Sequence, residues 1–267
     1  MQNIISSSGI HLQHLANCKA TAALWMIPGF TETPAVLHSI QTIAMAAKLN
    51  LYWITLPGFG SPMMPELDRQ LIPALTQTLE QYSNGSPIML LGHSLGGTIA
   101  TKLIPTMPTD QAQLFLNCDG MLVEDTAGTA RSLSAASQYQ NAEAFKAMII
   151  EKYEQIISQL KTESNNKRIL MRYLNNIQKW PATTLHQWSL YSNLILKDNT
   201  IAKQYQQLSC ASYFIRGEHS MAYLEQQYIE NKNIDSISIA GSGHWPMLDN
   251  KQAFLKVINR CIEHHLK

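Results

Sequence analysis

One short stretch of this sequence carries residue types and spacing that could do chemistry. Gly92–Gly96 reads Gly-His-Ser-Leu-Gly and fits the pattern Gly-x-Ser-x-Gly. The two glycines permit a sharp, strained turn between a strand and a helix, and such a turn exposes the hydroxyl of Ser94 at a helix N-terminus. This arrangement predicts a nucleophilic serine. The alternative is an ordinary strand-to-helix turn with a capping serine.

The elements around Ser94 favour the nucleophile. An apolar run without helical spacing, Ile88–Leu91, predicts a buried strand before it, and Thr98–Met107 can continue as a helix after it. Upstream, strands alternate with helices, which predicts a mostly parallel sheet with right-handed crossovers. The expected upstream elements are an opening hairpin over Asn3–Ile5 and Ile10–Leu15, strands over Ala22–Ile27 and Leu51–Thr55, and helices over Pro34–Lys48 and Glu66–Tyr82.

Downstream of Ser94 the alternation is interrupted. Residues 121–208 are polar and helix-prone, with Ala142–Leu160 and Lys167–Ile177 as the clearer helices and Trp180-Pro181 as a break between helices. The elements expected on either side of this region are strands over Ala112–Cys118, Ala211–Arg216 and Ile234–Ile239, and helices over Met221–Asn231 and Asn250–His265. The region therefore reads as an insertion into a strand-and-helix core.

Composition sets the outer bounds. The chain has 267 residues, 45% of them hydrophobic, which is ample for one large core, and a net charge of +1 that gives nucleic-acid or membrane-surface binding little support. Its four cysteines are scattered, without the spacing of a zinc site or a disulfide scaffold. No secretory signal or membrane span is evident, so we expect a soluble, cytoplasmic protein.

Together these motifs resemble the α/β-hydrolase superfamily, and the resemblance covers nearly the whole chain. It implies an α/β fold with a mostly parallel twisted sheet flanked by helices. The implied division is a hydrolase core over 1–120 and 209–267 and a helical cap over 121–208. The chain is similar to bacterial esterases and to haloalkane-dehalogenase-like members, although the nucleophile of the dehalogenases is an aspartate where this chain has Ser94.

The resemblance also implies the partners of Ser94. His244, in a Gly-His pair after the last expected strand, matches the catalytic histidine. The acid of the triad often lies in Gly-x-x-Asp after the preceding strand, but this chain has Ser220 there, and a hydroxyl cannot supply the negative charge. Asp119, at the end of Ala112–Cys118, is the first choice for the acid because some superfamily members carry it at that place, and Glu218 is the second. As the alternative, Asp119 makes only a turn or a cap.

The oxyanion hole follows from the same match. Its backbone N–H donors would be Phe30, after Pro28-Gly29, and Leu95, after the nucleophile. The substrate pocket is expected to involve four further side chains, although most Met and Trp residues of the cap could simply pack it onto the core. These four are His93, Met121, Trp188 and Trp245.

The function implied is that of a serine hydrolase that cleaves a carboxylic ester or thioester with a small to medium apolar acyl group through an acyl-enzyme. We expect a small-molecule ester or acyl substrate and no cofactor, metal or nucleic acid. The alternative is a non-catalytic small-molecule-binding or receptor-like homologue, which the missing aspartate at Ser220 favours. The retention of both Ser94 and His244 favours the enzyme.

Overall fold

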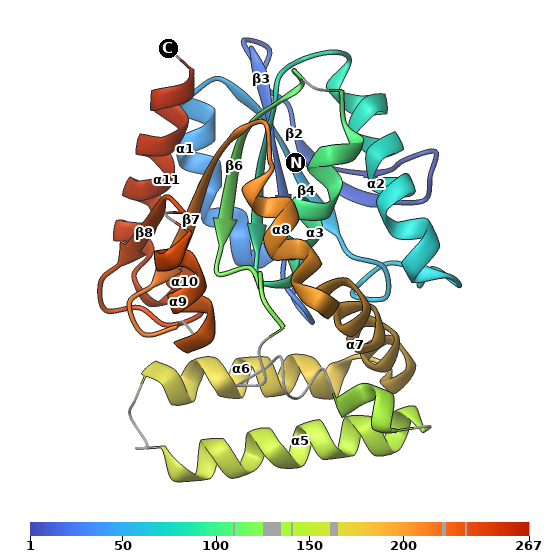
Figure 1. Cartoon of the computed structure of the whole chain (residues 1–267). Helices are drawn as coiled ribbons and strands as arrows, with labels where there is room; N and C mark the ends of the chain where they lie inside the picture. The colour runs from blue at the N-terminus through green and yellow to red at the C-terminus, as the bar shows by residue number, and fades with distance from the viewer. Residues whose placement is uncertain are drawn as a thin grey trace.

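The computed structural model describes residues 1–108, 110–124, 135–139, 141–160, 165–220, 223–232 and 234–266, without the side chains of 165–166 and 223–226. Its centre is a sheet with the order β1-β2-β4-β3-β5-β6-β7-β8 (Figure 1). Among the strands of the described residues, only β2 is antiparallel to the others. The strands are β1 (Gln2–Ile5), β2 (His11–Leu15), β3 (Ala22–Ile27), β4 (Leu49–Thr55), β5 (Ile88–His93), β6 (Ala112–Cys118), β7 (Ala211–Gly217) and β8 (Ser236–Ile239).

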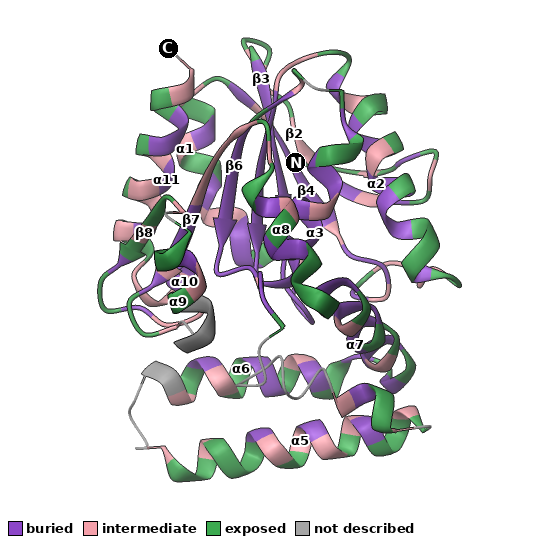
Figure 2. Cartoon of the chain, viewed as in Figure 1, coloured by how far each residue is buried: buried purple, intermediate pink, exposed green. Residues whose placement is uncertain are grey.

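Helices cover both faces of the sheet, so the central strands are buried on both faces and consist mainly of apolar residues. Every residue of β3 and β5 is buried, as Figure 2 shows for the interior of the core. One face packs against η1 (Pro34–Ile40), α1 (Gln41–Ala46) and α11 (Lys251–His265). The other packs against α2 (Leu67–Ser83), α3 (Leu95–Leu103) and α8 (Thr200–Gln206). Short elements complete the core: η2 (Ile104–Thr106), η4 (Lys197–Asn199), α9 (Tyr223–Asn231) and α10 (Pro246–Asp249).

The predicted strands and helices of the core are confirmed, with small shifts at their ends. The expected helix over Pro34–Lys48 is a 3-10 helix followed by α1, and the expected helix over Thr98–Met107 starts at Leu95 and ends as η2. Met221, the expected start of the helix before β8, lies outside the described residues. No helix in the described ranges has the length and apolar character needed to cross a bilayer.

A group of helices lies across the carboxyl ends of the parallel strands. It contains η3 (Ala135–Gln138), α5 (Ala142–Gln159), α6 (Asn165–Lys179) and α7 (Ala182–Leu196), and Figure 1 shows α6 between α5 and the core. The side chain of Asn141 caps α5 by accepting from the Glu143 and Ala144 amides. The predicted break at Trp180-Pro181 is confirmed, since α6 ends before it and α7 begins after it.

Two indoles attach these helices to the core. Trp180 Nε1 donates to the Thr31 carbonyl oxygen at 3.0 Å, and Trp188 Nε1 donates to that of Pro57 at 2.8 Å. Both rings also pack on Phe59, with centroids 5.6 and 5.9 Å away. α8 packs against α3 and therefore belongs to the core, although it lies within 121–208. We propose that the cap comprises the remaining helices of that predicted region, η3 and α5 to α7.

Candidate active site

Ser94 lies at a strained turn between β5 and α3. Its backbone has φ 52° and ψ −123°, a conformation that a non-glycine residue rarely adopts, and its amide donates to the Cys118 carbonyl oxygen at 2.8 Å. A Cβ on Gly92 would lie 2.5 Å from backbone atoms of Gly96, and one on Gly96 would collide with the Ile27 carbonyl oxygen. Both glycines are therefore required by close approach of the backbone, as the pattern predicts.

His244 comes to Ser94 from the opposite end of the chain. Its Nε2 lies 3.0 Å from Ser94 Oγ, within hydrogen-bond reach for proton transfer. The residue lies on the segment 240–249 between β8 and the end of α10, which we call the histidine loop. The loop is held by Asp249, whose carboxylate accepts from the Gly243 amide at 2.9 Å.

Asp119 is buried and follows β6 directly, one residue after the carbonyl group that accepts from the Ser94 amide. Its backbone is left-handed, with φ 50°. The carboxylate accepts from Ser220 Oγ at 2.7 Å and from the Gly217 amide at 3.1 Å. It makes no hydrogen bond to His244 in this structure. The serine at the position of the usual aspartate thus holds the carboxyl group that is the first choice to replace it.

Burial perturbs the pKa values of both titratable candidates. It raises the pKa of Asp119 to about 7, against the opposing effects of the bonds from Ser220 and Gly217 and of the His93 charge. Burial also lowers the pKa of His244 to about 3, with the positive charge of His93 adding to the effect. His244 is therefore neutral near pH 7, the state that a general base requires.

Glu218, the second choice for the acid, points elsewhere. Its exposed carboxylate accepts from the Gly241 amide at 2.8 Å, at the beginning of the histidine loop. Its backbone amide donates to the Ile239 carbonyl oxygen at 3.0 Å. These contacts give Glu218 a role in holding the turn after β8.

The two amides expected to form an oxyanion hole lie on segments that meet Ser94. Leu95 is the first residue of α3, where amides lack a partner within the helix. Phe30 lies on the segment 28–33 after β3, which we call the oxyanion loop. A Cβ on Gly29 in this loop would be 3.0 Å from Ser94 Cβ. Among the described residues, neither the Phe30 nor the Leu95 amide has a hydrogen-bond partner.

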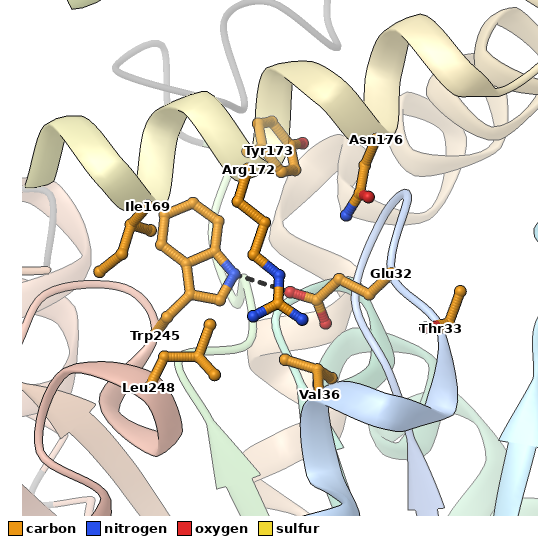
Figure 3. A pocket seen from close by; sticks show the side chains of 9 residues that line it. All are labelled: Glu32, Thr33, Val36, Ile169, Arg172, Tyr173, Asn176, Trp245 and Leu248. Carbon is orange, nitrogen blue, oxygen red and sulfur yellow. Dashed lines mark hydrogen bonds between the residues drawn. The ribbon is translucent and has the colours of Figure 1, made fainter.

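Glu32 is a site residue that the sequence analysis did not identify. It is buried, with 5% of its surface exposed, and its Oε2 lies 2.8 Å from His93 Nδ1 and 2.6 Å from the Gly29 amide nitrogen. Its Oε1 accepts from Trp245 Nε1 at 2.7 Å, as the dashed line in Figure 3 shows. A carboxylate three residues after Gly29, in an otherwise uncharged loop, is the signal that could have revealed it.

The four residues expected to line the pocket occupy different environments. His93 and Trp188 are fully buried, and Met121 is partly buried against the core. Trp245 lines a cavity of about 50 Å³ between the core and α6, to which Glu32 and Arg172 also contribute (Figure 3). No group of three or more His, Cys, Asp or Glu side chains that could hold a metal occurs in the described ranges.

The fold and the serine–histidine geometry define a protein of the α/β-hydrolase class. The family model of the alpha/beta hydrolase family matches residues 26–257, and the chain belongs to this family. "Putative esterase/lipase 1" of Mycoplasma genitalium is 22% identical over 226 residues, covering 79% of this chain and 81% of that protein.

Solved structures of esterases share the fold. A thermophilic esterase from Thermogutta terrifontis has a TM-score of 0.76 at 16% identity, with 100% of both chains covered. An esterase from Exiguobacterium antarcticum has a TM-score of 0.72 at 13% identity, with 98% of both chains covered. The predicted α/β-hydrolase fold is confirmed.

Proposed function

We propose that this protein is a serine hydrolase that cleaves carboxylic esters or thioesters with a small to medium apolar acyl group. The observation that carries the proposal is the 3.0 Å separation of Ser94 Oγ and His244 Nε2 at a strained turn. A serine hydroxyl is a weak nucleophile until a base takes its proton, and a neutral imidazole in hydrogen-bond reach is such a base.

The mechanism begins when Ser94 Oγ attacks the carbonyl carbon and His244 Nε2 takes its proton. The Phe30 and Leu95 amides stabilise the negative oxygen of the tetrahedral intermediate. His244 then protonates the leaving alcohol or thiol as the carbonyl re-forms, which leaves an acyl-enzyme. Water attacks this ester with His244 again as base, and the acid and free Ser94 are released.

Asp119 is the acid that we propose to stabilise protonated His244. It is buried and directly follows Cys118, whose carbonyl oxygen accepts from the Ser94 amide, whereas Glu218 is exposed and bonded to Gly241. In the resting structure its carboxylate faces Ser220 and Gly217, so the proposal requires it to interact with His244 when the imidazole becomes charged. Catalytic hydrogen bonds often shorten only when the substrate is bound.

Labelling with a fluorophosphonate probe tests the proposal. Rapid labelling of the wild type and its loss in Ser94→Ala would support an activated serine. Hydrolysis of p-nitrophenyl butyrate should fall roughly 10⁴-fold or more in the same variant. Parallel measurements on Asp119→Asn and Glu218→Gln identify the acid, since the true acid's variant should lose roughly 10² to 10⁴-fold.

The missing hydrogen bond between Asp119 and His244 supports the alternative, a non-catalytic binding protein, as does the serine at position 220 in place of the usual aspartate. A wild-type protein that does not react with the fluorophosphonate probe and hydrolyses neither esters nor an acyl thioester would favour that alternative. The same panel, with butyryl and acetyl esters beside an acyl thioester, separates ester from thioester preference in an active protein.

A further inference from the structure

A buried charged pair lies beside Ser94, and the acyl-transfer steps do not use it. His93 Nδ1 lies 2.8 Å from Glu32 Oε2, and His93 Nε2 lies 2.8 Å from the His244 carbonyl oxygen. A backbone carbonyl can only accept, so Nε2 must carry a proton. The remaining question is whether Nδ1 carries one as well.

The surroundings of Glu32 answer this question. The carboxylate accepts from the Gly29 amide at 2.6 Å and from the Trp245 indole at 2.7 Å, so donors surround it and favour the ionised form. Nδ1 must then donate to it, which makes His93 an imidazolium. Burial opposes both charges, yet the charge and hydrogen bond of each partner outweigh it: they lower the pKa of Glu32 and raise that of His93.

The pair joins the three segments that form the site. Glu32 holds the oxyanion loop through the Gly29 amide and the histidine loop through Trp245, while His93 holds the histidine loop through the His244 carbonyl oxygen. A Cβ on Gly29 would lie 2.9 Å from Glu32 Oε2 and 3.0 Å from Ser94 Cβ. The carboxylate is therefore close to the place where an oxyanion would form, and an unneutralised charge there would oppose catalysis.

We propose that Glu32 and protonated His93 form a charge-neutral clamp that positions the oxyanion loop and the histidine loop and cancels the carboxylate charge beside the oxyanion. Both are positioning residues, because neither touches the reacting atoms. This inference rests on the proposed hydrolase function.

Other titratable groups surround the clamp and determine its effect on pH dependence. They are Arg172 and Tyr173 of α6 near Glu32 (Figure 3), and Cys118, Asp119 and His244 near the pair. The His93 charge lowers the pKa of both Asp119 and His244. Replacing His93 with a neutral residue should raise both pKa values. The acidic limb of the pH–activity profile should then move to higher pH, whether ionisation of Asp119 or deprotonation of His244 limits the activity.

The test compares wild type, Glu32→Gln, His93→Gln and the double variant in p-nitrophenyl butyrate hydrolysis across pH 5 to 9. Loss of the His93 charge should lower kcat/KM roughly 100-fold, because the oxyanion loop is misplaced and Glu32 is left unpaired. The acidic limb of the plot of kcat/KM against pH should move to higher pH in His93→Gln. The double variant should lose less than His93→Gln and return the limb toward its wild-type position, since it contains no unpaired buried charge.

A second readout is independent of activity. Long-range ¹⁵N–¹H spectra of histidine-labelled wild type should show an imidazolium pattern from pH 6 to 8 that disappears in the double variant. A neutral His93 would overturn the clamp even if the wild type is an active hydrolase. The clamp would also be overturned if the losses of kcat/KM in the two single variants multiplied in the double variant and the acidic limb of the pH profile did not move. Imidazolium in a protein without activity would instead contradict only the hydrolase proposal. If His93→Gln does not fold, Glu32→Gln, the double variant and the spectra still decide.

Discussion

The hydroxyl of Ser220 should determine the pH at which this protein becomes active. It donates to Asp119 Oδ1 at 2.7 Å and lies 3.0 Å from the Gly217 carbonyl oxygen, so its single proton is shared. A hydrogen bond to a charged group stabilises it by about 1.5 to 3 kcal/mol, and sharing favours the lower end. Since one pKa unit corresponds to about 1.4 kcal/mol, Ser220→Ala should raise the pKa of Asp119 by about one unit.

The consequence for activity can be worked out from the pKa of Asp119, which burial raises to about 7. At pH 7 about half of the wild-type carboxyl groups are ionised, and about a tenth would be ionised in Ser220→Ala. In the proposed mechanism only ionised Asp119 can stabilise the imidazolium of His244, so kcat/KM at pH 7 should fall about fivefold. At pH 9 both proteins are almost fully ionised and should be nearly equally active.

The assay is p-nitrophenyl butyrate hydrolysis from pH 5.5 to 9.5, with Ser220→Thr as the matched control that keeps a hydroxyl. The acidic limb of kcat/KM should move up by about one unit in Ser220→Ala and stay in place in Ser220→Thr. A loss of the same size at every pH would refute the reasoning, because it would mean that Ser220 supports the loop and not the ionisation of Asp119.

Three further predictions concern the framework. Gly96→Ala should lower the free energy of unfolding by about 3 kcal/mol, as a urea titration would measure, because the new methyl group collides with the Ile27 carbonyl oxygen; an unchanged midpoint would contradict the turn geometry. Trp188→Ala should cost about 3 to 5 kcal/mol and Trp188→Phe clearly less, since the residue is fully buried. Because the pKa of His244 is lowered in the folded protein, the unfolded chain takes up a proton at this residue first as the pH falls. The free energy of unfolding should therefore decrease as the pH drops below about 6.5 toward 3. Urea titrations at pH 7 and 4.5 should show a smaller loss of stability in His244→Gln than in wild type, by up to about 2.5 kcal/mol, and equal losses would exclude His244 as the cause.

The sequence predicted the elements whose signals are local. β5, Ser94 and α3 follow from an apolar run, two glycines and a helix-forming segment within twenty residues. The sheet follows from the same alternation of strands and helices, and the family match confirms the fold. The catalytic roles of Ser94, His244 and Asp119 remain predictions, and the fluorophosphonate panel tests them.

The contacts that sequence reasoning missed join residues far apart in the chain. Glu32 and His93 are 61 positions apart and meet only because β3 and β5 are neighbours in the sheet. The residue type of Trp188 predicts either a pocket residue or one that packs the cap onto the core, but it does not reveal that the indole is bonded to a carbonyl oxygen 131 positions earlier. Neither partnership leaves a periodic or compositional trace, so each required the tertiary arrangement.

The two indole bonds between cap and core also provide an optical reporter. Lifting α6 and α7 away from the core would break the bonds of Trp180 to Thr31 and of Trp188 to Pro57 and would bring both rings into water. Tryptophan emission shifts to longer wavelength when a buried indole becomes hydrated, while Trp25, fully buried in the sheet, would contribute a steady background. Stopped-flow emission during mixing with an ester would therefore detect any movement of these helices in a protein that carries no added dye.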